Sequence, residues 1–151
     1  MRYGVFVRGR ALTALVLAAL LAAADLAHKA SASTPPWAYH ARSTAWVALS
    51  LALLGAVAAL TRIPSLSVAA GAGILAGGVL GNLVSGVLNG LAVPDPIVVA
   101  TGSGVAAFNL ADIFVFTGIL SLTVALFVTT IRHRDSLRPP RDWERGLRRR
   151  S

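Results

Sequence analysis

The chain has 151 residues, of which 56% are hydrophobic and only 13% are charged, whereas charged residues make up about 25% of an average soluble domain. This composition argues against a soluble single domain. There is no cysteine, which excludes a disulfide framework, a zinc-thiolate site and a cysteine nucleophile. The net charge of +8 is concentrated at the ends, because 11 of the 14 basic residues lie in the first ten or the last 20 positions.

The charged residues between positions 11 and 131 are few and separate long apolar stretches: Asp25, Lys29, Arg42, Arg62, Asp95 and Asp112. A helix needs about 20 apolar residues to cross about 30 Å of hydrocarbon. The stretches therefore predict four membrane spans, at about residues 10–27, 44–61, 66–88 and 108–131. The predicted fold is an all-α membrane protein, with a four-transmembrane-helix bundle in residues 1–131 and a basic tail in residues 132–151.

The distribution of arginine and lysine predicts the orientation of these spans, because basic residues near span ends stay cytoplasmic. Twelve of the 14 lie in the N-terminal segment, the turn at 62–65 and the tail, against two in the outward loops. We therefore expect both termini to be cytoplasmic and the segments 28–43 and 89–107 to form external loops. The tail is typical of a segment attracted to anionic membrane lipid, and we do not expect nucleic acid as a partner.

The first span has an alternative interpretation as a cleaved signal peptide. Basic residues precede its apolar run, and Ala30-Ser-Ala32 follows it like a cleavage site. We expect the span to be retained, because Asp25 and Lys29 near its end belong to the candidate functional site. Their spacing of four residues lets them pair on one face of a helix.

The third span carries small residues at every fourth position, which places them on one face of a helix: Ala69, Gly73, Gly77, Gly81 and Ser85. In lipid, such a ridge allows another helix to approach closely, so it predicts helix packing rather than a substrate site. Asn82 follows the ridge, and an amide at that depth needs hydrogen-bond partners.

Each of the three acids outside the tail has a structural explanation when taken alone. Asp25 can form a local ion pair with Lys29, Asp112 can form a capping box with Asn109, and Asp95 can belong to a turn between two prolines. Together, however, all three fall at the outward membrane face, where a carboxylate is costly and therefore indicates function. Two adjacent carboxylates share one proton and can activate water, which is aspartyl protease chemistry.

No competing chemistry is indicated by the sequence. The three histidines, His28, His40 and His133, lack the spacing of a metal site, and no G-x-S-x-G motif is present. We expect neither a metal nor another cofactor.

Three stretches resemble the lipoprotein signal peptidase (signal peptidase II) family of bacterial membrane aspartyl proteases. Asp25-Leu-Ala-His-Lys29 is similar to the family's D-x-x-x-K, Gly77-Gly-Val-Leu-Gly-Asn82 to G-G-x-x-G-N, and Phe108-Asn-Leu-Ala-Asp112 to F-N-x-A-D. The resemblance implies a four-helix bundle with a small extracytoplasmic β-lobe. It also implies catalytic roles for Asp95 and Asp112, which lie 17 residues apart.

The resemblance further implies that Asn82, Asn109, Asp25 and Lys29 support the catalytic pair. Arg42 and Ser43 stand near the family's A-R-N-x-G and are candidates for a substrate loop. The chain departs from the family where G-N-x-x-D-R is expected, since Ser85 and Gly86 replace the acid and the arginine. The V-V-D-F element has likewise become Val93-Pro-Asp-Pro96.

Two functional hypotheses follow. The first is an endopeptidase of the bacterial inner membrane that cleaves the signal peptide of a prolipoprotein before its lipid-modified cysteine. The second is a non-catalytic relative that binds lipidated peptides or a membrane partner, which the changes at Ser85 and Gly86 favour. An ion-conducting bundle is disfavoured, because the inner halves of the spans offer no polar face.

Overall fold

The computed structural model describes residues 2–102 and 104–134. The elements in chain order are α1 (Arg2–Ser31), the 3-10 helix η1 (Pro36–Ala38), β1 (Tyr39–Ala41), α2 (Thr44–Leu60), α3 (Leu66–Leu88), β2 (Ala92–Pro94), β3 (Ile97–Thr101), β4 (Gly104–Phe108) and α4 (Leu110–His133). Residues 135–151 of the predicted basic tail lie outside the described part of the chain.

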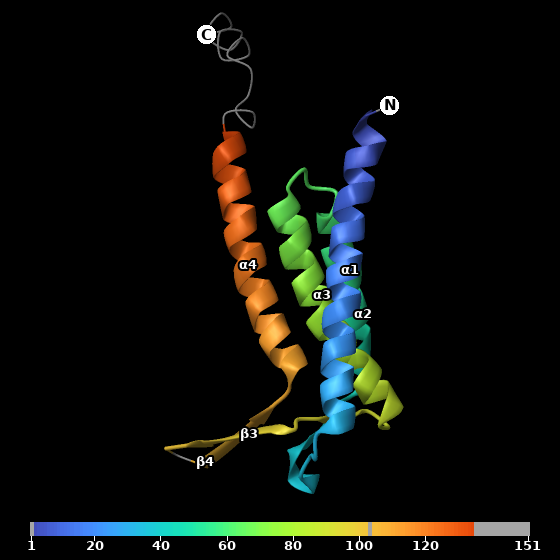
Figure 1. The fold of residues 1–151 in the computed structure, drawn as a ribbon, viewed down its shortest axis with the longest axis vertical. Helices are drawn as coiled ribbons and strands as arrows, with labels where there is room; N and C mark the ends of the chain where they lie inside the picture. The colour runs from blue at the N-terminus through green and yellow to red at the C-terminus, as the bar shows by residue number, and fades with distance from the viewer. Residues whose placement is uncertain (1, 103, 135–151) are drawn as a thin grey trace, which may run out of the picture.

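The four helices run along a common direction, with α3 between α1 and α4 (Figure 1). The start of α1 and the end of α4 lie at one end of the bundle, and the β3–β4 hairpin projects sideways at the other end.

Three of the helices are long and apolar enough to cross a membrane: Arg8–Ser31 within α1, Leu66–Leu88 and Leu110–His133. The fourth helix, α2, is apolar but has only 17 residues. The prediction of a mostly helical membrane protein is therefore confirmed, whereas α2 is shorter than a usual span. The last helix begins at Leu110 rather than at residue 108, because Phe108 ends β4 and Asn109 is the N-cap.

Close approach of α1 to α3 depends on the predicted ridge of small residues. A Cβ atom built on Gly73 would lie 2.7 Å from the carbonyl oxygen of Ala14, and one on Gly77 would lie 2.8 Å from the Cβ atom of Leu21. Since real Cβ atoms do not approach so closely, only glycine permits this helix spacing. The packing interpretation is confirmed for Gly73 and Gly77.

A second face of α3 packs against α4 in the same way. A Cβ atom on Gly78 would lie 2.5 Å from the carbonyl oxygen of Ala111, and one on Gly118 would lie 2.5 Å from the Cα atom of Leu75. Beside these contacts, α2, α3 and α4 share a cluster of buried apolar side chains: Val57, Val68, Ala72, Leu75, Val79, Leu122 and Ala125. Helix α3 is thus the centre of the bundle.

The segments between the helices at the hairpin end of the bundle contain two small antiparallel sheets. Strand β1 pairs with β2, and β3 pairs with β4 as a hairpin. The segment 89–107, expected to be a loop, therefore contains β2, β3 and most of β4. Thr101 and Gly104 form the last pair of the hairpin. The β-lobe implied by the family resemblance is present as these two sheets.

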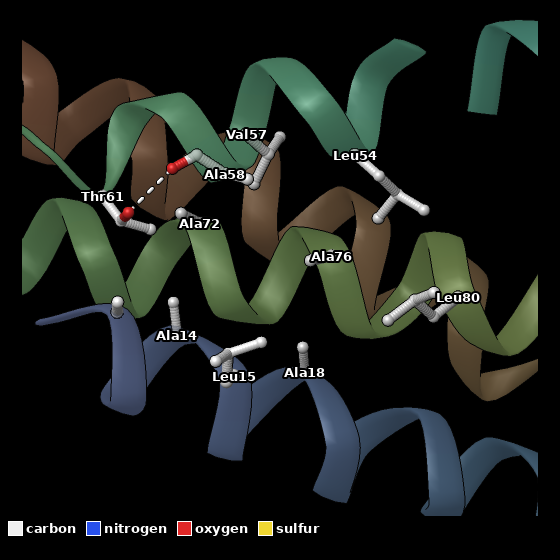
Figure 2. A pocket seen from close by; sticks show the side chains of 11 residues that line it. Ala14, Leu15, Ala18, Leu54, Val57, Ala58, Thr61, Ala72, Ala76 and Leu80 are labelled. Carbon is white, nitrogen blue, oxygen red and sulfur yellow. Dashed lines mark hydrogen bonds between the residues drawn. The ribbon is translucent and has the colours of Figure 1, made fainter. Parts of the chain in front are cut away.

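An apolar cavity of about 330 Å³ lies between α1, α2 and α3. Figure 2 shows Ala14 and Ala18 of α1 facing α3, with α2 on the far side. Thr61 is the polar residue of the lining, and its hydroxyl donates to the carbonyl oxygen of Ala58 at 2.7 Å. The cavity therefore offers no free polar group for chemistry.

Candidate functional site

A cluster of buried polar side chains lies where the end of α1, the second half of α3, the segment after β2 and the start of α4 meet. Six members are at most 9% exposed: Asp25, Lys29, Asn82, Ser85, Asp95 and Asn109. Asp112 joins them and is partly buried. Because burial of a polar group is costly unless it is hydrogen-bonded, the partners of each side chain show how the cluster is organised.

Asp25 and Lys29 form an ion pair across one turn of α1, as their spacing predicts. The distance from Lys29 Nζ to Asp25 Oδ2 is 2.7 Å. Asp25 Oδ1 also accepts a hydrogen bond from the backbone N–H of Ala111, at 2.8 Å. A Cβ atom on Gly81 would lie 2.6 Å from Asp25 Oδ2, so glycine at this position makes room for the carboxylate. The pair is therefore a link among three helices rather than a local contact alone.

Lys29 extends the cluster to α3 through two further hydrogen bonds. Its ammonium group donates to Asn82 Oδ1 at 2.8 Å and to Ser85 Oγ at 3.2 Å. A lysine has three donor hydrogens, and the carboxylate, the amide and the hydroxyl provide an acceptor for each. Asn82 is thereby oriented, because its oxygen faces Lys29 and its amide nitrogen faces the other way.

Asn82 Nδ2 donates to Asp112 Oδ1 at 2.9 Å. The other oxygen of Asp112 accepts from the backbone N–H of Asn109 at 3.2 Å, and Asn109 Oδ1 accepts from the backbone N–H of Asp112 at 3.1 Å. These two bonds form the capping box at the start of α4 that the sequence predicts. Asp112 is therefore a helix cap and a member of the polar cluster at the same time.

Asp95 follows β2 and is 2% exposed. Its backbone N–H donates to the carbonyl oxygen of Ala38 at 3.0 Å. Asn109 Nδ2 donates to Asp95 Oδ1 and also approaches the carbonyl oxygen of Pro94 at 3.4 Å. Asp95 is thus buried and hydrogen-bonded, unlike an ordinary exposed turn residue.

The structure brings six sequence-predicted site residues into one continuous network. Hydrogen bonds and the ion pair run in the order Asp25, Lys29, Asn82, Asp112, Asn109, Asp95. Asn109 is the residue between the two carboxylates, since its backbone contacts Asp112 and its side chain contacts Asp95. In the described part of the chain, no cluster of histidine, aspartate and glutamate side chains could hold a metal ion.

The two substrate-loop candidates lie beside this network and not within it. Ser43 is the N-cap of α2, and its hydroxyl accepts from the backbone N–H of Trp46 at 3.2 Å. The guanidinium of Arg42 lies over the ring of Trp46, 5.5 Å from its centroid, which is the geometry of a cation-π contact. Ser43 therefore caps α2 although it is exposed, and Arg42 is partly buried.

Two members of the site were not identified as such from the sequence. His40 of β1 hydrogen-bonds to Asp95 through Nδ1, although the two residues are 55 positions apart. Ser85 was assigned to the packing ridge, yet its hydroxyl accepts from Lys29. The Ser85 contact could have been inferred from the position of Ser85 three residues after Asn82, whereas the His40 contact depends on strand pairing that no local pattern reveals.

Comparison with known protein families identifies the chain. Residues 34–128, more than half of it, match the sequence profile of the family described as Signal peptidase (SPase) II. The chain belongs to the signal peptidase II family. The matched region includes Asp95, Asp112, Asn82 and Asn109, but it begins after α1, which supplies Asp25 and Lys29.

A solved structure, described as "Bacterial membrane enzyme structure by the in meso method at 2.3 A resolution", has a similar fold. The TM-score is 0.61 at 21% sequence identity, and the similarity covers 78% of this chain and 89% of that chain. At this identity, the likeness concerns the fold alone. No curated protein matches the chain.

Proposed function

We propose that this member of the signal peptidase II family is an intramembrane aspartyl endopeptidase. It cleaves the signal peptide of a lipid-modified prolipoprotein before the diacylglyceryl-cysteine, with Asp95 and Asp112 as the catalytic pair. The observation that carries the proposal is that Asn109 contacts both carboxylates, through its side chain on one and its backbone on the other.

In this reaction, the two carboxyl groups share one proton and divide the acid and base roles. The ionised carboxylate takes a proton from water as the water oxygen bonds to the scissile carbonyl carbon, while the protonated carboxyl gives its proton to the carbonyl oxygen. The carbon-nitrogen bond then breaks, and the leaving nitrogen takes the proton acquired from water. The carbonyl re-forms by returning its proton, so the pair regains its starting state with no cofactor consumed.

The remaining network residues support the pair in this proposal. Asn109 and Asn82 fix the orientation of the carboxyl groups, since each amide contacts one of them. Asp25 and Lys29 in turn fix Asn82, because Lys29 donates to its oxygen. Preorganised groups of this kind spare the reaction the cost of orienting them at the transition state.

The substrate reaches the pair from the membrane. In this proposal, the partners of the protein are the prolipoprotein and the surrounding lipid. The partly exposed Arg42, beside the site, belongs to the loop that contacts the substrate. We place the protein in the bacterial inner membrane with four spans and both termini cytoplasmic. With 17 residues at a rise of about 1.5 Å, α2 is about 25 Å long, which local thinning of the bilayer can accommodate.

The test compares purified wild-type protein with Asp95→Asn and Asp112→Asn on a synthetic diacylglyceryl-cysteine precursor. Each substitution should lower the cleavage rate by about 1000-fold or more, and the double variant should be little worse, because residues that act as a unit are not additive. Asp142→Asn, in the tail, is the matched control and should cleave at the wild-type rate. An Asp112→Asn rate within about threefold of wild type would contradict the catalytic assignment, since a capping role alone affects only stability, by about 1 kcal/mol.

The second candidate function is a non-catalytic relative that binds the precursor. Ser85 and Gly86 replace the family's acid and arginine, and a side chain at position 86 would be tightly packed. A Cβ atom on Gly86 would already lie 3.3 Å from Val93 Cγ2 and 3.4 Å from Trp46 Cζ3. Binding of the precursor by wild-type protein without cleavage, under conditions in which an active signal peptidase II cleaves it, would favour this candidate.

A further inference from the structure

His40 is an ionisable residue of the site to which neither the sequence nor the family resemblance assigns a role. It lies in β1, directly opposite Val93 of the antiparallel strand β2. This register places its ring beside Asp95, which follows β2 by one residue, and His40 Nδ1 hydrogen-bonds to Asp95 Oδ2. The His40 side chain is 51% exposed, whereas that of Asp95 is 3% exposed.

When Asp95 is the ionised member of the pair, its carboxylate can only accept, so His40 Nδ1 then donates the hydrogen. Asp95 Oδ1 is already held by the amide of Asn109. The carboxylate is therefore held at both oxygens by donors from different elements, β1 and α4, and each oxygen retains a lone pair for a water molecule.

The other charged groups of the cluster approach Asp95 and its neighbours from different sides. Asp112 contacts the backbone of Asn109, and Asp25 and Lys29 lie on α1 beyond Asn82. Arg42, two residues after His40, lies over Trp46. Within residues 2–102 and 104–134, Asp95 is the hydrogen-bond partner of the His40 ring.

We propose that His40 is a positioning residue of the peptidase reaction. By donating from Nδ1 to Asp95 Oδ2, it holds the carboxylate in the orientation in which Asp95 meets water and its partner Asp112. The inference rests on the proposed function for its catalytic consequence. A misplacement of about 1 Å in a catalytic group can lower a rate by about 100-fold, so loss of this donor should lower kcat rather than weaken substrate binding.

The experiment compares His40→Leu, which removes the donor, with His40→Asn, whose Nδ2 hydrogens can replace Nδ1–H. For cleavage of the diacylglyceryl-cysteine precursor, we expect His40→Leu to lower kcat by about 100-fold with KM within about twofold of wild type. His40→Asn should recover activity to within about tenfold of wild type. The matched control is His133→Leu, the same substitution at the opposite end of the bundle, and it should leave kcat unchanged.

Three kinetic outcomes would overturn the proposal while leaving the peptidase function intact. They are a His40→Leu kcat within about twofold of wild type, an effect on KM alone, and a His40→Asn variant no better than His40→Leu. Thermal unfolding of His40→Asn in detergent should match wild type, whereas His40→Leu should be less stable, because the buried Asp95 carboxylate loses one donor.

A spectroscopic readout tests the contact independently of activity. In protein labelled with ¹⁵N-histidine, the His40 signal is identified by its absence from His40→Leu. Its Nδ1 shift should be that of a protonated nitrogen in wild type and should change in Asp95→Asn. An unprotonated Nδ1, or a shift that Asp95→Asn leaves unaltered, would overturn the proposal. Absence of cleavage by wild type would overturn the proposed function, and this measurement would still decide the His40–Asp95 contact.

Discussion

The two halves of α3 use the same spacing of small residues for different purposes. In the first half, Gly73 and Gly77 lie against the backbone and apolar side chains of α1. In the second half, Gly81 lies against the Asp25 carboxylate and Ser85 accepts from Lys29. A small residue at every fourth position thus allows close approach in both halves. In the first half, the backbone and apolar side chains of α1 approach α3, and in the second half a buried ion pair does.

This difference shows why the site lies at one end of the bundle only. Beside the first half of α3 is the apolar cavity, whose single polar lining residue is already hydrogen-bonded. Beside the second half, each buried polar group finds partners from other elements. The two halves should therefore respond differently to substitution. In the second half, a substitution removes charge pairing, and in the first half it changes packing.

The largest effect on stability should come from Asp25→Asn in the polar half. This change leaves the buried ammonium of Lys29 without its carboxylate, and breaking one side of a buried ion pair costs about 3 to 5 kcal/mol. We expect a large fall in the Tm measured in detergent. The double variant Asp25→Asn/Lys29→Met should be more stable than the single variant, because it no longer buries an unpaired charge. Equal Tm values for the two would mean that the charge is not buried in the folded protein.

A smaller effect is expected from Gly78→Ala, at the contact of α3 with α4. The new methyl group would meet the backbone of Ala111 at 2.5 Å, and overpacking of this kind costs about 1 to 3 kcal/mol. Gly55→Ala in α2 is the matched control, since no atom lies within 4 Å of the position of its Cβ. The control should be neutral or slightly stabilising, because alanine favours a helix over glycine. A Gly78→Ala variant as stable as this control would contradict the close packing of the two helices.

The smallest effect should come from Ala76→Leu in the apolar half. Ala76 lines the cavity, so the larger side chain has space, and we expect a change in stability within about 0.5 kcal/mol. Ala69→Leu is the matched comparison, because Ala69 is fully buried on the same helix and does not line the cavity. It should be destabilised by about 1 to 3 kcal/mol. Equal losses of stability in the two variants would contradict the presence of free space beside Ala76.

The sequence predicted the helices well, because each is marked by an apolar stretch of 17 or more residues. Such a stretch can be recognised without knowledge of tertiary contacts. It also predicted the pairing of Asp25 with Lys29 and the cap formed by Asn109 and Asp112, since both are contacts within one turn. In each case the local contact was correct but incomplete. Lys29 also contacts Asn82 and Ser85, and Asp112 also contacts Asn82.

The strands and the His40 contact could not be predicted from local pattern. Strands β1 and β2 have three residues each, too few for an alternating pattern to be distinguished from a loop. Their pairing joins segments more than 50 residues apart, and it is this pairing that brings His40 to Asp95. The segment 89–107 was predicted as a loop, yet Ile97–Thr101 and Gly104–Phe108 pair as a hairpin.

The hydrogen bond from the Ala111 backbone to Asp25, across 86 positions, has a consequence for biogenesis. As the chain emerges from the ribosome, α1 enters the membrane first, with Asp25 and Lys29 able to pair at once because they lie on the same helix. Asn82 arrives with the third helix, and Asn109, Ala111 and Asp112 arrive only with the last. A nascent chain arrested before Asn109 therefore lacks two of the six residues of the polar network and the backbone donor to Asp25. Completion of the polar network coincides with insertion of the final helix, so under the proposed function cleavage cannot begin before the bundle is closed.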